Sequence, residues 1–176
     1  MNSYSFDPPR YTYSDYKNWK EDWELLNGYY FQLLPYASQR HSKTFVNFIA
    51  QGKSELKSNI DCDCTLYAKL DWKISEETVV RPDMMIICGN ASDNYLEFPP
   101  VLVLEIISPS SIKKDRVIKF ELYREQGVKY YLLSDYLKQT VEVFDLIDNY
   151  YKQVDKNTFI LDKNCKISFD FDDVWE

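Results

Sequence analysis

Apolar residues recur every three or four positions in the first third of the chain, which is the period of an amphipathic helix. This spacing predicts a helix over residues 14–27, with Ser14 as its N-cap and Gly28 as its stop. It predicts a second helix up to about residue 58, with Ser38 as its N-cap.

From residue 64 onward the pattern changes to the short apolar runs and alternation of β-strands. The run 101–107 is apolar except for Glu105, which predicts a central strand buried on both faces. A third helix is expected over 112–126, with Gly127 as its stop. The other expected strands span 29–34 (ended by Pro35), 64–74, 79–88, 128–133, 140–146, 150–154, 158–161 and 166–171. This order predicts a single α/β (α+β) domain with a mixed β-sheet flanked by helices.

Composition narrows the chemistry. The chain has 176 residues, 28 acidic against 21 basic side chains, and a net charge of −7, which argues against a strongly basic nucleic-acid binder. A single histidine excludes a two- or three-histidine zinc centre, and none of the four glycines forms a phosphate-cradling loop. No apolar stretch is long enough for a membrane span, and no signal peptide is seen, so a cytoplasmic location without membrane contact is expected.

The four cysteines are Cys62, Cys64, Cys88 and Cys165. A structural zinc site usually has two close pairs in the sequence, and Cys88 and Cys165 are singletons. We therefore expect reduced, partly buried thiols, with a zinc site as the less favoured alternative.

Glu105 and Asp83 each stand in a strongly apolar segment, where a carboxylate is costly to bury unless it is paired or binds a cation. If the two strands form an antiparallel hairpin centred on Asn94, the two acids lie directly opposite each other on one face. A divalent cation between them would remove their repulsion, and hard oxygen ligands suit Mg²⁺ or Mn²⁺. The alternative is that each acid pairs with a basic neighbour such as Arg81 or Lys119.

Several motifs together resemble the Uma-two family of restriction-endonuclease-like proteins in the PD-(D/E)XK superfamily. They are Arg81-Pro82-Asp83, the run Glu105-Ile106-Ile107-Ser108-Pro109-Ser110, and then Asp115, Lys119, Tyr123 and Gly127-Val128. The segment from Glu24 to Gly28, His41 in the second helix, and the C-terminal segment 167–175 also resemble the family. The resemblance covers most of the chain.

The resemblance implies a restriction-endonuclease-like domain over 13–176 after an N-terminal extension, 1–12. It implies an endonuclease that hydrolyses phosphodiester bonds in DNA, with Mg²⁺ or Mn²⁺ bound by Asp83, Glu105 and Glu24. The strand lysine that is usual in the superfamily is replaced by Ile107, and Lys119 on the next helix is the candidate substitute for this catalytic group. The alternative is a non-catalytic nuclease-fold module that binds nucleic acid or a protein partner.

Other side chains are candidates for substrate contact. The basic helix start, with Lys113, Lys114 and Arg116, could hold a phosphate backbone or could simply be a solvated face. Tyr123, Ser108 and His41 are further candidates, although a buried tyrosine, a helix-capping serine and a packing histidine are the simpler interpretations. The fifteen tyrosines could cover a homodimer face.

Overall fold

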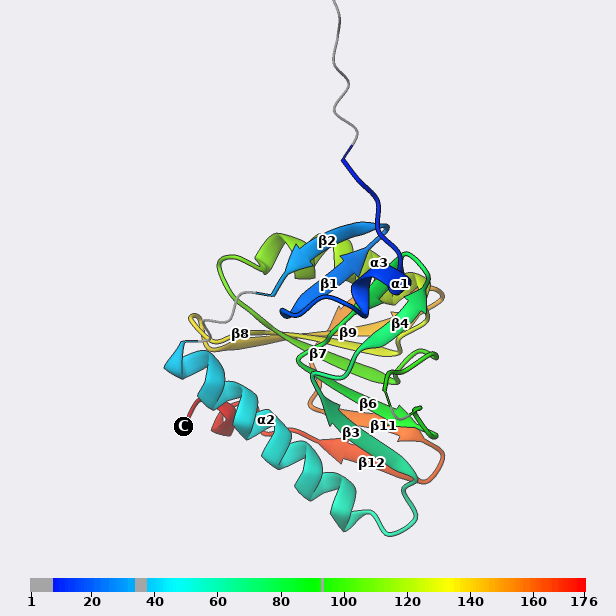
Figure 1. Cartoon of the computed structure of the whole chain (residues 1–176). Helices are drawn as coiled ribbons and strands as arrows, with labels where there is room; N and C mark the ends of the chain where they lie inside the picture. The colour runs from blue at the N-terminus through cyan, green and yellow to red at the C-terminus, as the bar shows by residue number, and fades with distance from the viewer. Residues whose placement is uncertain (1–7, 34–37, 93) are drawn as a thin grey trace, which may run out of the picture.

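Figure 1 shows the computed structural model of the chain, which describes residues 8–33, 38–92 and 94–176. Its centre is a six-stranded sheet with the order β10-β9-β8-β7-β6-β3, in which β7 and β8 are parallel and all other neighbours are antiparallel. The strands are β3 (Cys64–Ala68), β6 (Met84–Cys88), β7 (Leu102–Ile107), β8 (Tyr130–Asp135), β9 (Thr140–Ile147) and β10 (Tyr150–Val154). The predicted mixed sheet, with the 101–107 segment as an interior strand, is therefore confirmed.

A second, four-stranded antiparallel sheet has the order β2-β1-β5-β4. Its strands are β1 (Trp23–Leu26), β2 (Tyr29–Gln32), β4 (Trp72–Ser75) and β5 (Thr78–Val80). A separate hairpin consists of β11 (Thr158–Asp162) and β12 (Cys165–Ser168). The helices are α1 (Tyr13–Tyr16), α2 (Gln39–Ser58), the π-helical η1 (Lys114–Lys119), which continues into α3 (Phe120–Glu125), and the 3₁₀ turn η2 (Asp173–Trp175).

The two faces of the central sheet are covered by different elements (Figure 1). Helix α2 and the β11–β12 hairpin pack on one face, where Phe48 and Phe169 meet Met84, Ile86 and Leu104. The small sheet, η1 and α3 pack on the other face, with a core that includes Trp72, Val103, Tyr123, Tyr131 and Leu133. The charged residues of interest lie on this second face.

Helix α2 begins where its cap predicts, because the Ser38 hydroxyl accepts a hydrogen bond from the His41 backbone N–H at 3.2 Å. The third predicted helix is also present, but its first turns are π-helical rather than α-helical. It ends before Gly127, whose φ of +79° is the left-handed conformation that favours glycine. Within the described residues, no helix is both long and apolar enough to cross a membrane.

The predicted helix over 14–27 is wrong. Only Tyr13–Tyr16 is helical, and residues 23–26 form β1, which pairs with β2 across a two-residue turn. Asn27 and Gly28 both have positive φ, +50° and +81°, as a type I′ hairpin turn requires. Gly28 therefore ends a strand, not a helix, and the helix-like aromatic spacing reflects packing among Tyr16, Trp19 and Trp23.

The predicted strands 64–74 and 79–88 are each divided between the two sheets. The first breaks at Lys69, which has a φ of +51°, and its halves are β3 and β4. The second breaks around Pro82, which has no backbone N–H to give to a sheet, and its halves are β5 and β6. In the strand predicted over 29–34, Leu34 lies outside the described residues, as does Pro35.

The expectation of reduced cysteines is also wrong for this structure, which contains disulfides Cys62–Cys165 and Cys64–Cys88. Cys64 and Cys88 are direct partners on β3 and β6, with Cα atoms 4.0 Å apart. Cys62 lies 103 residues from its partner. These contacts depend on strand register and on where the C-terminal hairpin packs, neither of which the cysteine spacing reveals.

Candidate active site

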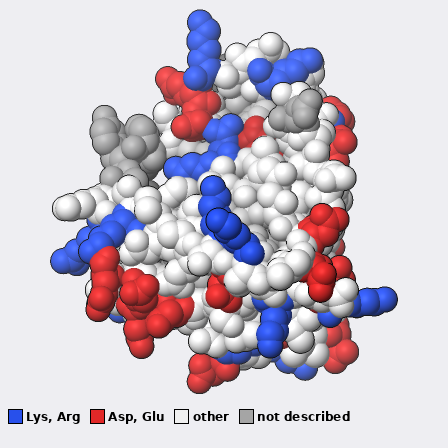
Figure 2. All heavy atoms as spheres, turned by 90° about the horizontal axis from the view of Figure 1, so that it is seen from below, with Lys and Arg blue, Asp and Glu red and all other residues white. Residues whose placement is uncertain are grey.

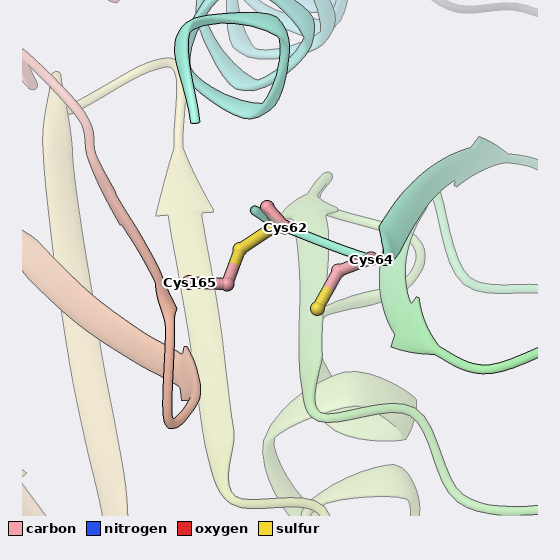
Figure 3. A group of neighbouring side chains, drawn as sticks. All are labelled: Cys62, Cys64 and Cys165. Carbon is pink, nitrogen blue, oxygen red and sulfur yellow. A yellow bond between two sulfur atoms is a disulfide. The ribbon is translucent and has the colours of Figure 1, made fainter. Parts of the chain in front are cut away.

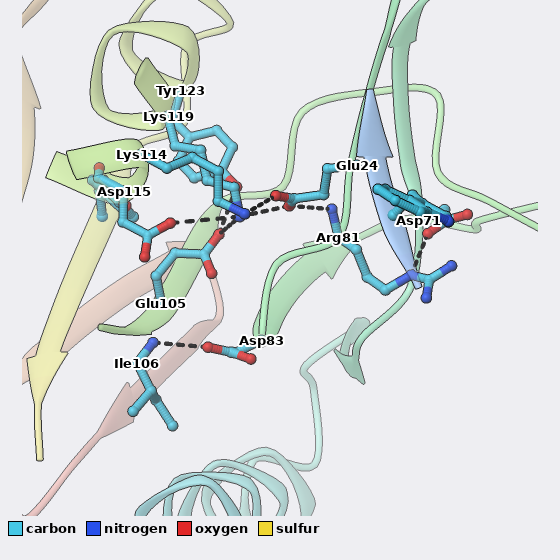
Figure 4. Close-up of polar contacts among 12 residues, drawn as sticks. Glu24, Asp71, Arg81, Asp83, Glu105, Ile106, Lys114, Asp115, Lys119 and Tyr123 are labelled. Carbon is cyan, nitrogen blue, oxygen red and sulfur yellow. Dashed lines mark hydrogen bonds and ion pairs between the residues drawn. The ribbon is translucent and has the colours of Figure 1, made fainter. Parts of the chain in front are cut away.

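Glu105 projects from β7 into the second face of the sheet and is only 4% exposed. Its Oε1 atom accepts two hydrogen bonds, from Lys119 Nζ at 2.8 Å and from the Tyr123 hydroxyl at 2.7 Å (Figure 4). Within the described residues, no hydrogen bond or ion pair reaches Oε2. The carboxylate is thus held by one oxygen, and the other oxygen remains available.

Lys119 is the centre of the polar network, with its side chain 2% exposed. Its Nζ lies 2.6 Å from Glu24 Oε1, 2.8 Å from Glu105 Oε1 and 3.8 Å from Asp115 Oδ1. Asp115, Lys119 and Tyr123 point toward the same place, as their spacing predicts (Figure 4). Lys119 does not lie on an exposed face of its helix, because the π-helical turn is packed so that the side chain is buried.

Glu24 reaches the network from β1 instead of from a helix and is fully buried. Its Oε1 accepts from the Arg81 backbone N–H at 2.9 Å and from Lys119, and Lys114 Nζ binds its Oε2. Both oxygens of Glu24 are therefore engaged. Lys119 takes the place between Glu24 and Glu105 where we had expected a metal cation.

Asp83 lies at the start of β6, and the predicted register is confirmed, because Met84 pairs with Leu104 and Met85 pairs with Val103. Continuing this register by one residue places Asp83 opposite Glu105. Asp83 Oδ2 accepts a hydrogen bond from the Ile106 backbone N–H at 2.8 Å (Figure 4). Asp83 is not paired with Arg81, whose guanidinium binds Asp71 and Asp22.

The charges of this site do not balance. Glu24, Asp83, Glu105 and Asp115 bring four carboxylates, while Lys114 and Lys119 bring two ammonium groups. If all are ionised, two negative charges remain in excess. This is the charge that one divalent cation neutralises.

Burial acts differently on the two central glutamates. Burial raises the pKa of Glu105 to about 8, because desolvation of its carboxylate outweighs the attraction of Lys119. For Glu24, desolvation is outweighed by the nearby Lys119 and Lys114, so its pKa lies below the ordinary value. Desolvation opposes the charge of Lys119, yet Glu105 and Glu24 hold its pKa well above the usual range. Glu105 is therefore the acid of this pair that takes up a proton when no cation is near.

The predicted substrate-contact residues lie in different environments, some exposed and others ion-paired or buried. Lys113 is exposed, whereas Lys114 is bound to Glu24 and Arg116 forms an ion pair with Glu142. Tyr123 is completely buried, so it supports Glu105 and is not at the surface.

Ser108 Oγ lies 2.9 Å from Ser110 Oγ and accepts from the Ser111 N–H, which is the predicted turn and cap role. His41 packs edge-on against Tyr136, with ring centroids 5.6 Å apart. The homodimer face stays a prediction, and Tyr30 and Tyr150 are highly exposed candidates for it.

One further feature, a surface cleft, is not predicted by the sequence. A cleft of about 490 Å³ lies between the start of α2 and the segment after β8. It is lined by Gln39, Arg40, Lys43, Thr44, Tyr136, Leu137, Gln139 and Trp175. β8 runs parallel to β7 with Asp135 beside Ile107, so this basic cleft is at the same end of the sheet as the Ser108 turn. Its residues come from segments far apart in the sequence.

Comparison with known proteins bears on the family and the fold of this chain. The family model for Uma2, described as "Putative restriction endonuclease", matches residues 11–162 of the 176. The chain belongs to the Uma2 family. The resemblance seen in the Asp83 and Glu105 motifs is confirmed, and the family links the chain to nuclease-like proteins.

A solved structure shares the Uma2 chain's fold. It is described as "a putative nuclease belonging to DUF820 from Anabaena variabilis ATCC 29413". The TM-score is 0.74 and the sequence identity is 16%, over 93% of this chain and 97% of that chain. At this identity the likeness shows the fold alone, and it confirms the predicted restriction-endonuclease-like architecture. No curated protein matches the chain.

Proposed function

We propose that this Uma2 protein is a metal-dependent endonuclease that hydrolyses phosphodiester bonds in DNA, with Mg²⁺ or Mn²⁺ bound by Asp83 and Glu105. The observation that carries the proposal is that two opposed acids, Asp83 and Glu105, each keep one oxygen outside the hydrogen bonds formed among the described residues. When all four carboxylates of the site are ionised, they exceed its two ammonium groups by two negative charges. A divalent cation would offset the charge, and nothing in an inert core would need such an arrangement.

The donor set fits a hard cation. Asp83 and Glu105 supply carboxylate oxygens, which Mg²⁺ and Mn²⁺ prefer over nitrogen or sulfur. A bound ion of this kind would polarise the phosphate and lower the pKa of the attacking water. Both oxygens of Glu24 are already bound by protein groups. Glu24 therefore supports this site indirectly, by binding Lys119 on the side away from Glu105.

The protein's own groups hold the two acids in place. The Ile106 N–H fixes one oxygen of Asp83, while Lys119 and Tyr123 fix one oxygen of Glu105. Lys119 thereby puts a positive charge beside the strand glutamate, where Ile107 cannot. We assign Lys119 to the catalytic centre as a positioning residue that also offsets negative charge developing at the phosphate.

DNA would be held by local basic groups, not by the overall charge of the protein. In Figure 2, acidic and basic side chains of the described residues are interspersed over the face shown, with no continuous basic band. Exposed Lys113 and the cleft residues Arg40 and Lys43 are the candidates for phosphate contact. Such contacts position a nucleic acid without reading its sequence.

Cleavage of plasmid and single-stranded DNA with Mg²⁺ or Mn²⁺ tests the proposal. We expect cleavage by the wild type, none by Asp83→Asn or Glu105→Gln, and retained cleavage with weaker, less salt-dependent binding for Lys113→Ala. Mg²⁺ should raise the melting temperature of the wild type but not of Asp83→Asn. Absence of both cleavage and a metal-dependent shift would favour the non-catalytic, nuclease-fold binding module instead.

A further inference from the structure

All four cysteines of the chain meet at one place, although they come from four separate positions in the fold. Cys62 lies in the loop after α2, Cys64 begins β3, Cys88 ends β6 and Cys165 begins β12. The sulfur atoms of Cys62, Cys64 and Cys165 lie within 4.8 Å of one another (Figure 3). Cys88 is bonded to Cys64. We refer to these four residues as the cysteine cluster.

We propose that, when its disulfides are reduced, the cysteine cluster binds one Zn²⁺ ion through four thiolates. Zinc bonded to four sulfurs at about 2.3 Å is tetrahedral, which places the sulfurs about 3.8 Å apart. The sulfurs of Cys62, Cys64 and Cys165 lie within 4.8 Å of one another, which is within about 1 Å of that arrangement. Cys88, whose sulfur is bonded to that of Cys64, would complete the set by side-chain rotation once this bond is reduced. The two close pairs that the sequence lacks are created by the fold, as Cys62 with Cys165 and Cys64 with Cys88.

The surroundings of the cysteine cluster suit a structural ion. Cys64 and Cys165 are buried at 8% and 3% exposure, while Cys62 and Cys88 are only partly buried and leave an entry for the metal. The only histidine, His41, is at the opposite end of α2, so the four sulfurs would form a closed site with no open position. Such a site is structural and not catalytic.

A zinc ion there would join parts of the fold that share no strand pairing. Among the described residues, the β11–β12 hairpin makes no strand pairing with the central sheet, yet its Phe159 and Ile167 and the following Phe169 cover the apolar face. Through Cys165 the ion would tie this hairpin to β3, β6 and the loop after α2. Removal of zinc from the reduced protein should therefore loosen the C-terminal hairpin first.

Reduction of the two disulfides and binding of Zn²⁺ are two balanced steps. Two equivalents of a phosphine reductant and two of water convert both disulfides to four thiols, and the phosphine leaves as its oxide. Binding of Zn²⁺ then displaces the thiol protons to the buffer. Among the charged neighbours, Asp61, Asp63 and Asp162 outnumber Lys163 and Lys166 by one, so the surroundings favour a cation slightly.

The experiment uses the full chain, reduced with a phosphine and freed of metal with a chelator. A thiol reagent should count four thiols, one equivalent of Zn²⁺ should remain bound after desalting and mask them, and the melting temperature should rise. Co²⁺ in place of zinc should give thiolate-to-metal charge-transfer absorption, which carboxylate ligands cannot produce. Four reactive thiols that retain no zinc would overturn the proposal, as would disulfides that resist reduction in the folded protein.

Variants separate this site from the acidic one. Cys62→Ser and Cys165→Ser should each lose the bound zinc and the Co²⁺ charge-transfer band. Asp83→Asn and His41→Ala should keep both, since neither residue belongs to the cysteine cluster. Loss of the band in Asp83→Asn, or its survival in Cys165→Ser, would also contradict a four-cysteine site.

Discussion

On one face of the central sheet, α2 and the β11–β12 hairpin cover Met84, Ile86 and Leu104 with an apolar layer. On the other face, Glu24, Glu105, Asp115 and Lys119 are buried to the same extent. The first face needs only shape and hydrophobicity, and burial of its side chains stabilises the fold directly. The second face carries charges whose removal from water costs several kcal/mol each before pairing offsets it. A costly polar face beside an apolar one marks where a fold holds its chemistry.

The largest expected effect comes from removing the ammonium group of Lys119, which lies at the centre of the polar network. Lys119→Ala should destabilise the protein by about 3–5 kcal/mol, because it leaves buried carboxylates without their partner. Phe48→Ala, on the apolar face, should cost a similar amount by leaving a cavity. Denaturant unfolding at several pH values separates the two, since only the cost of Lys119→Ala should shrink as acidification neutralises the carboxylates.

Lys113→Ala is the control, because Lys113 is an exposed residue immediately before the same π-helix. It should change the free energy of unfolding by no more than about 0.5 kcal/mol. If Lys119→Ala is as mild as this control, the buried network is not holding the two sheets together.

The second prediction concerns pH. Burial raises the pKa of Glu105 from 4.5 to about 8, so between these values the folded state binds a proton that the unfolded state has released. Without metal, stability should therefore fall as pH rises through this window, by at most about 1.4 kcal/mol per pH unit from this residue. The difference in unfolding free energy between wild type and Glu105→Gln in a chelator measures it.

Mg²⁺ should reduce that pH dependence, because a cation favours the ionised form of Glu105. A wild type that parallels Glu105→Gln at every pH would show that Glu105 does not take up the proton. The same measurement with Mg²⁺ then reports directly on the proposed metal site.

The two faces also differ in how far sequence could predict them. The amphipathic helix capped by Ser38 and the strand 101–107 follow from the spacing of apolar residues. The opposition of Asp83 and Glu105 follows from one assumed turn position. Glu24 was expected from a helix because its neighbouring aromatics repeat at helical spacing. Asn27-Gly28, a strong local signal for a hairpin, was present in the sequence and indicates the strand that the structure contains.

The pairings within the site depend on tertiary contacts that no local pattern encodes. Lys119 faces Glu24 across 95 positions of sequence only because β1 folds over η1. Helical spacing puts Lys119 on the same face as Asp115 and Tyr123, but it does not show that this face is buried. The division of two predicted strands between two sheets has the same origin, since alternation predicts a strand but not the sheet to which it belongs.

The third prediction concerns the Tyr123 hydroxyl, an uncharged hydrogen-bond donor within the polar face. Tyr123→Phe removes the hydroxyl that donates to Glu105 Oε1 and should cost about 1–3 kcal/mol. Tyr151→Phe is the matched control, since the Tyr151 hydroxyl donates to the Val128 carbonyl, a neutral acceptor, in a partly buried position. Thermal unfolding should show the smaller loss for Tyr151→Phe, and the reverse order would mean that Glu105 does not depend on Tyr123.

The smallest effect is expected at Ser134, a buried polar residue on the apolar face. Ser134 on β8 is fully buried in line with Tyr130 and Leu132. Its Oγ is the single buried side-chain nitrogen or oxygen atom among the described residues that has no hydrogen-bond partner. Because an unpaired hydroxyl is costly to bury, Ser134→Ala should raise stability by up to about 1 kcal/mol. Denaturant unfolding measures this change. Ser42→Ala is the control, because Ser42 is an exposed serine on α2. A loss of stability in Ser134→Ala would show that the hydroxyl has a partner in solution, such as a buried water, and that this face is less uniformly apolar than its packing indicates.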